Sequence, residues 1–151
     1  RPGADYGWMS NWSAHDVVCD GQVFLTVEHY IMYSKARSMM DAETAAQILA
    51  CKTPKEAKAL GRKVKCFNDV MWISLRPPLI FHALKAKIER HPELREALLA
   101  TGTSVLAEAA PYDKVWGIGL AADDPRARNV KNWGENVLGK AWMDLRAGLT
   151  D

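Results

Sequence analysis

The chain has 151 residues, a length that fits one domain with a sizeable hydrophobic core. Hydrophobic residues make up 48% and charged residues 25%, and no apolar run reaches the length of a membrane span, so the composition indicates a soluble globular protein. The formal net charge of +2 neither requires nor excludes a nucleic-acid partner.

The cysteine usage points to a reducing compartment. Cys19, Cys51 and Cys66 share no close spacing, and an odd, scattered count argues against a disulfide framework. The N-terminus shows no signal-peptide pattern. We therefore expect an intracellular, cytoplasmic location.

The first half of the chain predicts a hairpin followed by helices. A short hairpin is expected from Asp16 to Phe24, with two apolar residues on each side of Asp20-Gly21, which is a favoured two-residue turn. Thr26 is a predicted cap for a helix to about Met40, and a second helix is expected over residues 42–50. The run Thr53-Pro54-Lys55-Glu56 then combines a cap, a first-turn proline and a capping-box glutamate.

The second half predicts three further helices. One opens at Asn68 or Asp69, is interrupted near Pro77-Pro78 and resumes to Arg90. Others run from His91 to Gly102 and from about Glu135 to Leu149, with short strands expected at residues 105–106 and around Trp116 and a polar loop over residues 121–131. The sum is a mostly helical α+β fold in a single domain over residues 1–151.

The loops of the C-terminal third carry residue types that suit a ligand. Glycines let a backbone approach a ligand closely, tryptophan offers a stacking surface, and carboxylates bring hydrogen bonds or acid–base chemistry. The pattern predicts a pocket for a ring-bearing, sugar-like or nucleotide-like molecule, and tight turns around a structural tryptophan are the alternative. The residues concerned are Glu108, Asp113, Trp116, Gly117, Gly119 and Asn136.

Glu28 and Lys35 are expected on one helix face. They are seven residues apart, nearly two helical turns, and apolar residues lie between them. A buried lysine has a lowered pKa, and its free amine can attack a sugar aldehyde carbon. The alternative is a lysine that extends to the surface beside a surface glutamate.

A basic stripe is expected on the helix after Thr53. Lys55, Lys58, Arg62 and Lys65 recur at helical spacing. The stripe is either a solvated face or a track for phosphates. The four histidines, by contrast, show no metal-ligand spacing, and no phosphate-binding P-loop is present, so we expect no metal.

A set of motifs runs in order along nearly the whole chain. They are Asn11, Val17 to Gly21, Val27-Glu28-His29-Tyr30, Lys35-Ala36, Lys58-x-x-Gly61-Arg62, Trp72, Lys87, Leu98-x-x-Thr101-Gly102, Leu106-x-Glu108, Asp113-x-x-Trp116-Gly117-Ile118-Gly119, Gly134-x-Asn136-x-Leu138-Gly139 and Met143-x-x-Arg146. Together they resemble the NADAR superfamily of YbiA-like N-glycosidases. One difference from many relatives is the run Met32-Tyr33-Ser34 directly before Lys35, where a Gln-Ala pair is usual.

The resemblance implies hydrolysis of a ribose C1–N bond, most directly the removal of ADP-ribose from ADP-ribosylated guanine in nucleic acid. The alternatives are hydrolysis of phosphorylated riboflavin-synthesis intermediates and a module that binds ADP-ribose without cleaving it. Lys35, Glu28 and Asp113 are the expected catalytic residues, and no metal or redox cofactor is needed. The expected ligand-binding residues are Asn11, Arg62, Trp72, Glu108, Trp116, Gly117, Gly119 and Asn136.

Overall fold

The computed structural model describes residues 6–150. The chain forms two compact units, Arg1–Arg95 and Glu96–Asp151, and the boundary falls inside helix α5, Pro92–Ala100. No helix within residues 6–150 is long and apolar enough to cross a membrane.

The first unit begins with a 3-10 turn, η1 (Gly7–Met9), and a hairpin. Strands β1 (Val17–Cys19) and β2 (Gln22–Phe24) pair antiparallel, with Val17 opposite Phe24. The predicted two-residue turn is confirmed, because Asp20 and Gly21 have φ values of 52° and 78°. Two consecutive positive φ values give the turn the twist that a hairpin needs.

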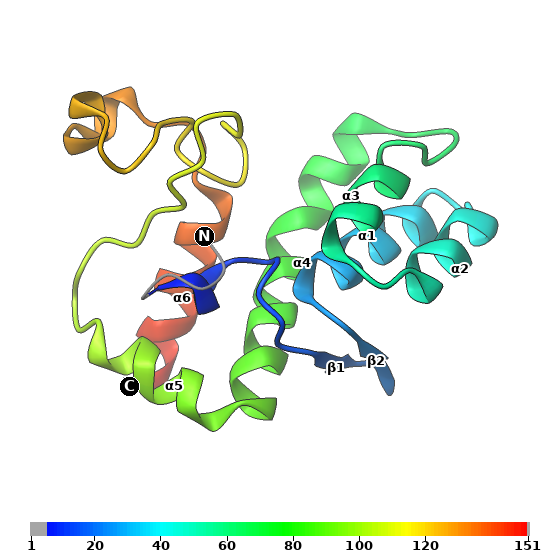
Figure 1. The fold of residues 1–151 in the computed structure, drawn as a ribbon, viewed down its shortest axis with the longest axis horizontal. Coiled ribbons are helices and arrows are strands. Elements are labelled where there is room, and N and C mark those ends of the chain that lie inside the picture. The colour runs from blue at the N-terminus through cyan, green and yellow to red at the C-terminus, as the bar shows by residue number, and fades with distance from the viewer. Residues whose placement is uncertain (1–5, 151) are drawn as a thin grey trace. The chain divides into compact units, whose positions relative to one another are not determined.

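Four helices make up the rest of the first unit: α1 (Val27–Ser38), α2 (Ala42–Ala50), α3 (Pro54–Gly61) and α4 (Asp69–Arg90). Helix α1 packs against α2, α3 and α4, and α4 also packs against β1 (Figure 1). The caps predicted at Thr26 and Thr53 are confirmed, since their side chains accept from the backbone N–H groups of His29 and Glu56. The basic stripe is shorter than predicted, because α3 ends at Gly61 and Lys65 lies beyond it.

The expected interruption of α4 was wrong. The helix runs unbroken through Pro77 and Pro78, although each proline lacks a backbone N–H. Packing of α4 against α1 and β1 on one side offsets the lost hydrogen bonds, and both prolines lie on the exposed side.

The second unit holds the remainder of α5, two 3-10 turns and helix α6. The turns are η2 (Pro125–Arg128) and η3 (Val130–Asn132), and α6 spans Val137–Leu149. The strands expected at residues 105–106 and around Trp116 did not form. The backbone of residues 114–118 bonds instead to the N–H groups of residues 134–138, and the Leu106 carbonyl accepts from the Asn136 side chain.

Candidate active site

Helix α1 presents Glu28 and Lys35 on one side of the first unit. Thr26 fixes the start of the helix, and the Glu28 backbone N–H donates to the Asn11 carbonyl at 3.0 Å. Glu28 is 8% exposed and Lys35 is half-buried. Lys35 is therefore partly shielded from solvent, and its catalytic role stays a prediction.

Several charges surround the Lys35 amine. Burial lowers the pKa of Lys35 below its ordinary value of 10.5, and the positive charge of Arg62 lowers it further. The carboxylates of Glu28 and Asp69 raise the pKa, but they do not cancel the effect of burial. A larger fraction of Lys35 is thus a neutral amine near physiological pH than for an exposed lysine.

An aromatic ring covers the amine. Lys35 Nζ lies 4.6 Å from the centre of the Phe67 ring, which belongs to the segment between α3 and α4. This distance is within the range of a cation–π contact. Phe67 is itself 40% exposed, so its ring lies at the surface and shields the amine on the side that it faces.

His29 secures the helix that carries Glu28 and Lys35. It is 1% exposed, its Nδ1 lies 2.8 Å from the Thr26 hydroxyl, and its Nε2 lies 3.2 Å from the Cys51 carbonyl. Burial lowers the pKa of His29, which favours the neutral ring. The neutral ring suits this pair of contacts, with Nδ1 accepting and Nε2–H donating. His29 thus links α1 to the segment before α3.

A buried lysine shapes the loop that holds Asn11. Lys87 of α4 is fully buried, and its Nζ donates to the Trp8 carbonyl (2.5 Å), the Ser10 carbonyl (3.0 Å) and the Ser13 hydroxyl (2.7 Å). Asn11 is 7% exposed, and its Oδ1 has no hydrogen-bond partner within the described residues. An unsatisfied buried acceptor is costly to fold and is therefore a functional candidate.

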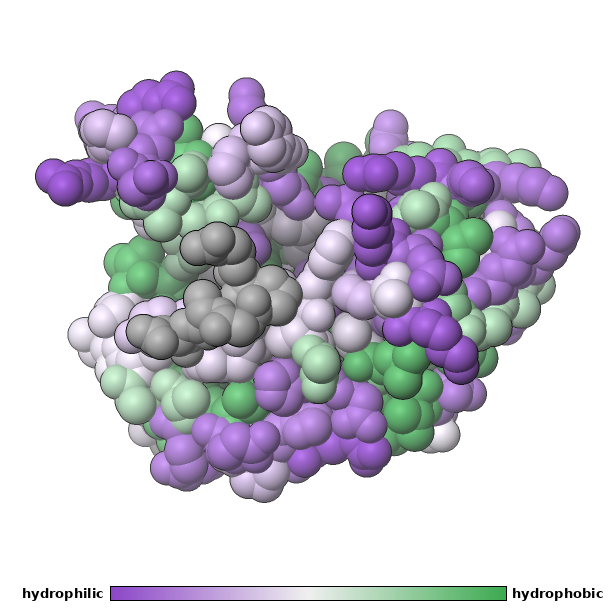
Figure 2. Space-filling view, in the orientation of Figure 1, coloured by the Kyte–Doolittle hydropathy of each residue, from purple (hydrophilic) through white to green (hydrophobic). Residues whose placement is uncertain are grey.

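Helix α3 lies against α1 near the candidate site. A side chain at Gly61 would meet Met32 Sδ at 2.2 Å, so a residue larger than glycine here would require the Met32 side chain to move. Arg62 follows directly and is exposed, and Lys58 Nζ lies 5.9 Å from the Trp12 ring centre. Figure 2 shows hydrophilic side chains gathered over α2 and α3. Lys55 of α3 is exposed.

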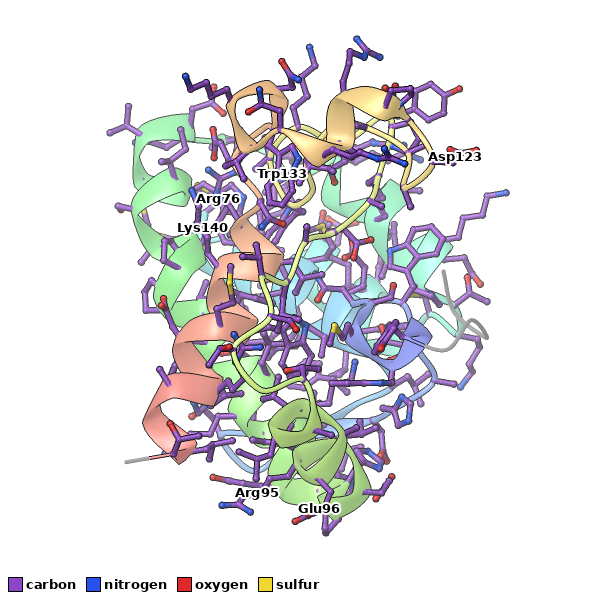
Figure 3. The ribbon with its side chains drawn as sticks, turned by 90° about the vertical axis from the view of Figure 1, so that its left-hand side faces the viewer. Arg76, Arg95, Glu96, Asp123, Trp133 and Lys140 are labelled. Atoms are coloured by element: carbon purple, nitrogen blue, oxygen red, sulfur yellow. The ribbon has the colours of Figure 1, made fainter. Side chains whose placement is uncertain are left out.

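Trp72 differs from the other expected ligand residues of the first unit. It is only 6% exposed, in the first turn of α4, so it offers little open ring surface. Its role as a ligand-binding residue stays a prediction. Helix α4 also buries Arg76, labelled in Figure 3, which is 9% exposed.

In the second unit, Asp113 organises the turn that carries Trp116. Its Oδ1 accepts from the backbone N–H groups of Val115 (3.0 Å) and Trp116 (2.9 Å). Asp113 and Trp116 are both half-buried. Both contacts use Oδ1, and neither involves Oδ2 of Asp113.

Asn136 ties two segments of the second unit together. Its side-chain Oδ1 accepts from Glu108 N, and its Nδ2 donates to the Leu106 carbonyl, both at 3.0 Å. Asn136 has a φ of 50° and is 3% exposed. Asparagine tolerates this left-handed backbone better than most residues, so its position before α6 follows from its chemistry.

The predicted glycine turn lies against the same segment. Ile118 N donates to the Glu108 carbonyl at 2.8 Å, and a side chain at Gly117 would lie 2.6 Å from that carbonyl oxygen. Gly119 has a φ of 74°, in the region that favours glycine. Glu108, Trp116, Gly117, Gly119 and Asn136 thus come together in the second unit.

Trp133 is used structurally. It follows η3 directly, and its indole Nε1 donates to the Ala127 carbonyl at 2.8 Å (Figure 3). This contact closes the polar segment predicted as a loop. Trp133 is therefore held by its own turn.

Two residues near Lys35 were missed by sequence reasoning. Phe67 and Asp69 carry no motif and are distant from Lys35 in sequence. The only available signal was the Lys58-x-x-Gly61-Arg62 motif, which marked the preceding helix. Within residues 6–150, no group of three or more His, Cys, Asp or Glu side chains is arranged to hold a metal ion.

Comparison with known proteins identifies the family. The NADAR domain model matches residues 1–150. The chain belongs to the NADAR family. Among similar proteins, an N-glycosidase of Acanthamoeba polyphaga mimivirus is 34% identical over 82% of this NADAR chain and 73% of its own length. An N-glycosidase of Nostoc punctiforme is also 34% identical, over 93% and 84% respectively.

The NADAR assignment extends to a solved structure. The NMR structure of the Escherichia coli protein YbiA is similar to this NADAR chain with a TM-score of 0.81 and 33% sequence identity. The similarity covers 98% of the present chain and 80% of YbiA. The mostly helical fold with its small antiparallel sheet is thus the YbiA fold, as predicted.

Proposed function

We propose that this NADAR chain is an N-glycosidase that hydrolyses a ribose C1–N bond and removes ADP-ribose from ADP-ribosylated guanine in nucleic acid. The observation that carries the proposal is the half-buried Lys35, whose pKa is lowered by burial, beside the buried Glu28. The N-glycosidase names of its relatives support the type of bond.

Lys35 suits the role of nucleophile. Its neutral amine attacks ribose C1 as the C1–N bond breaks, and the leaving guanine nitrogen takes up a proton. Loss of an Nζ proton and opening of the ribose ring give an imine. Water adds to the imine carbon, the amine of Lys35 leaves, and the released ADP-ribose recloses its ring.

Glu28 suits the stabilisation of charge. Positive charge develops at C1 as the bond to nitrogen breaks, and a carboxylate held nearby lowers the energy of that state. Glu28 is fixed by its place in the first turn of α1 and by the backbone contact with Asn11. Asn11 Oδ1, which has no partner within residues 6–150, is an acceptor for a ligand hydroxyl or amino group.

A nucleic-acid substrate is favoured by the charge around Lys35. Arg62 acts electrostatically on Lys35, so a cation that can hold a phosphate lies near the proposed nucleophile. Lys55 and Arg62 are exposed and Lys58 is half-exposed, so α3 can contact more than one phosphate. A single phosphomonoester would not need this many cations.

The second unit supplies the remaining proposed roles. Asp113 is the second catalytic carboxylate, and Trp116 stacks on a base. Gly117 and Gly119 let backbone N–H groups reach a phosphate. Glu108 and Asn136 complete the proposed set, with Asn136 holding the Glu108 backbone in place.

The test is turnover of an oligonucleotide that carries ADP-ribosylated guanine, with released ADP-ribose separated by chromatography. We expect release by the wild type and by Lys85→Ala, a control at an exposed lysine of α4, but not by Lys35→Ala. Binding without release by the wild type would instead make the chain a reader of ADP-ribose. If phosphorylated riboflavin precursors were cleaved faster than ADP-ribosylated guanine, the proposed substrate would be wrong and only the proposed type of bond would stand.

A further inference from the structure

The segment between α3 and α4 is fixed by two backbone contacts to the α1–α2 junction. The Lys65 N–H donates to Asp41 Oδ2 at 3.0 Å, and the Asn68 N–H donates to Met39 Sδ at 3.3 Å. A thioether sulfur is a weak acceptor, whereas a carboxylate is a strong one. Asp41 therefore provides the stronger of these two hydrogen bonds, and Phe67 lies on the segment between them.

Asp41 is held rigidly before it meets Lys65. The Asp41 N–H donates to the Ala36 carbonyl at 2.9 Å, and Met40 between α1 and α2 has a φ of 59°, which together form a Schellman turn. Asp41 then caps α2: its Oδ1 accepts from Thr44 N (3.1 Å) and its Oδ2 from the Thr44 hydroxyl (2.7 Å).

The Asp41 carboxyl is suited to remain an anion. The hydrogen bond from the Lys65 N–H and those from Thr44 hold the pKa of Asp41 below its ordinary value. Its side chain is 8% exposed, so water competes little for these contacts. The carboxylate of Asp41, which follows the end of α1, thus holds the residues that precede α4.

We propose that Asp41 is a positioning residue that fixes the segment from Arg62 to Asn68 so that the Phe67 ring covers the Lys35 amine. This inference rests on the proposed function for the role of Lys35 in the reaction. The attachment at Lys65 is two residues from Phe67, and the Phe67 ring lies 4.6 Å from Lys35 Nζ. The ring keeps water from one side of the amine and limits the directions in which it can point.

Two substitutions separate the attachment from the helix cap. Asp41→Asn keeps an oxygen at Oδ1 for Thr44 N but places an amide NH₂ against both the Lys65 N–H and the Thr44 hydroxyl, so the attachment is lost and the hydroxyl must turn to accept from the amide. Thr44→Val removes the hydroxyl contact to Oδ2 and leaves Lys65 bonded. Phe67→Ala, at a residue that is 40% exposed, removes the ring itself and serves as the reference in which no ring covers the Lys35 amine.

The readout is the NMR ring-current shift of the Lys35 ε-methylene protons, measured against Phe67→Ala. We expect Asp41→Asn to lose more than half of this shift and Thr44→Val to retain it. Retention of the shift in Asp41→Asn, or equal loss in Thr44→Val, would overturn the proposal. A general loss of folding is detected by thermal unfolding of each variant.

Turnover of the modified oligonucleotide gives the second readout. Asp41→Asn and Phe67→Ala should each lower kcat about tenfold, since small misplacements of a reacting group are costly, and the double variant should fall no further. Unchanged turnover in both single variants would overturn the positioning role. Full turnover by Lys35→Ala would overturn the proposed function, while the ring-current comparison would still decide whether Asp41 holds the segment.

Discussion

Lys35 Nζ lies 4.6 Å from the centre of the Phe67 ring, although Lys35 belongs to α1 and Phe67 to the segment that precedes α4. The same amine is influenced by charges from three places: Glu28 on α1, Arg62 at the end of α3 and Asp69 at the start of α4. The pKa of Lys35 can therefore be shifted in either direction by substitution.

The first prediction concerns that shift. Asp69→Asn should lower the pKa of Lys35, because an anion that favours the charged amine is removed, and Arg62→Gln should raise it. An NMR titration of Lys35 in each variant measures both changes without substrate. Shifts of both variants in the same direction would contradict this description of the site.

The pKa also fixes how the rate depends on pH. The neutral amine is the reactive form, so kcat/KM should rise with pH through the pKa of Lys35. Because that pKa is lowered in the folded protein, the rise should be centred below 10.5. Asp69→Asn should move the midpoint to lower pH, in parallel with the titration.

The second prediction concerns the two carboxylates. Glu28→Gln and Asp113→Asn should each lower kcat by about 10²-fold and affect ligand binding much less, since a carboxylate matters most when positive charge develops at C1. Asn at position 113 retains an acceptor for Val115 N and Trp116 N, so the turn should persist. Glu56→Gln on exposed α3 is the control. A variant with wild-type kcat would assign that carboxylate a purely structural role.

The local features of the fold were predictable because they are encoded by adjacent residues. Thr26 and Thr53 cap their helices, and Asp20-Gly21 forms the hairpin turn, since each depends on residues within one turn of the chain. The unbroken α4 was not predictable, because packing on α1 and β1 outweighs the local effect of Pro77 and Pro78.

The candidate site was predictable only in part. Helical spacing placed Glu28 and Lys35 on one face, and in the structure Lys35 is half-buried and feels the charge of Glu28. The Phe67 ring and the Asp41 attachment depend on contacts between distant segments, which periodicity does not contain. The expected strand near Trp116 did not form, because Asp113 accepts from the N–H groups there and the backbone N–H groups at the start of α6 donate to the carbonyls of Val115 and Trp116.

The third prediction concerns the close contact of α3 with α1. Gly61→Ala should lower the free energy of unfolding by about 1–3 kcal/mol, because the added methyl meets Met32 Sδ. Met32→Ala in the same chain should recover part of that loss, since the flexible side chain is removed. Chemical unfolding of the two single variants and the double variant gives the coupling energy. Strict additivity would show that the two residues do not press on each other.

The fourth prediction concerns α3 and the polymer. Lys55→Glu with Lys58→Glu should weaken oligonucleotide binding and reduce its salt dependence by about one unit of slope per lost phosphate contact. Cleavage of a modified mononucleotide should barely change. Reversal of the charge of the exposed Lys85 on α4, in Lys85→Glu, is the control. Equal loss on both substrates would place these lysines in the substrate pocket, and no loss on either would make them a solvated face.

The most direct test of the central claim is borohydride trapping during turnover of oligonucleotide that carries ADP-ribosylated guanine. Reduction of the imine should leave a stable ADP-ribosyl adduct, and peptide mass spectrometry should locate it on Lys35. Lys35→Ala and Lys35→Arg should give neither adduct nor turnover, because a guanidinium is a poor nucleophile at any accessible pH. Full turnover by Lys35→Ala, or an adduct on another residue, would contradict the account.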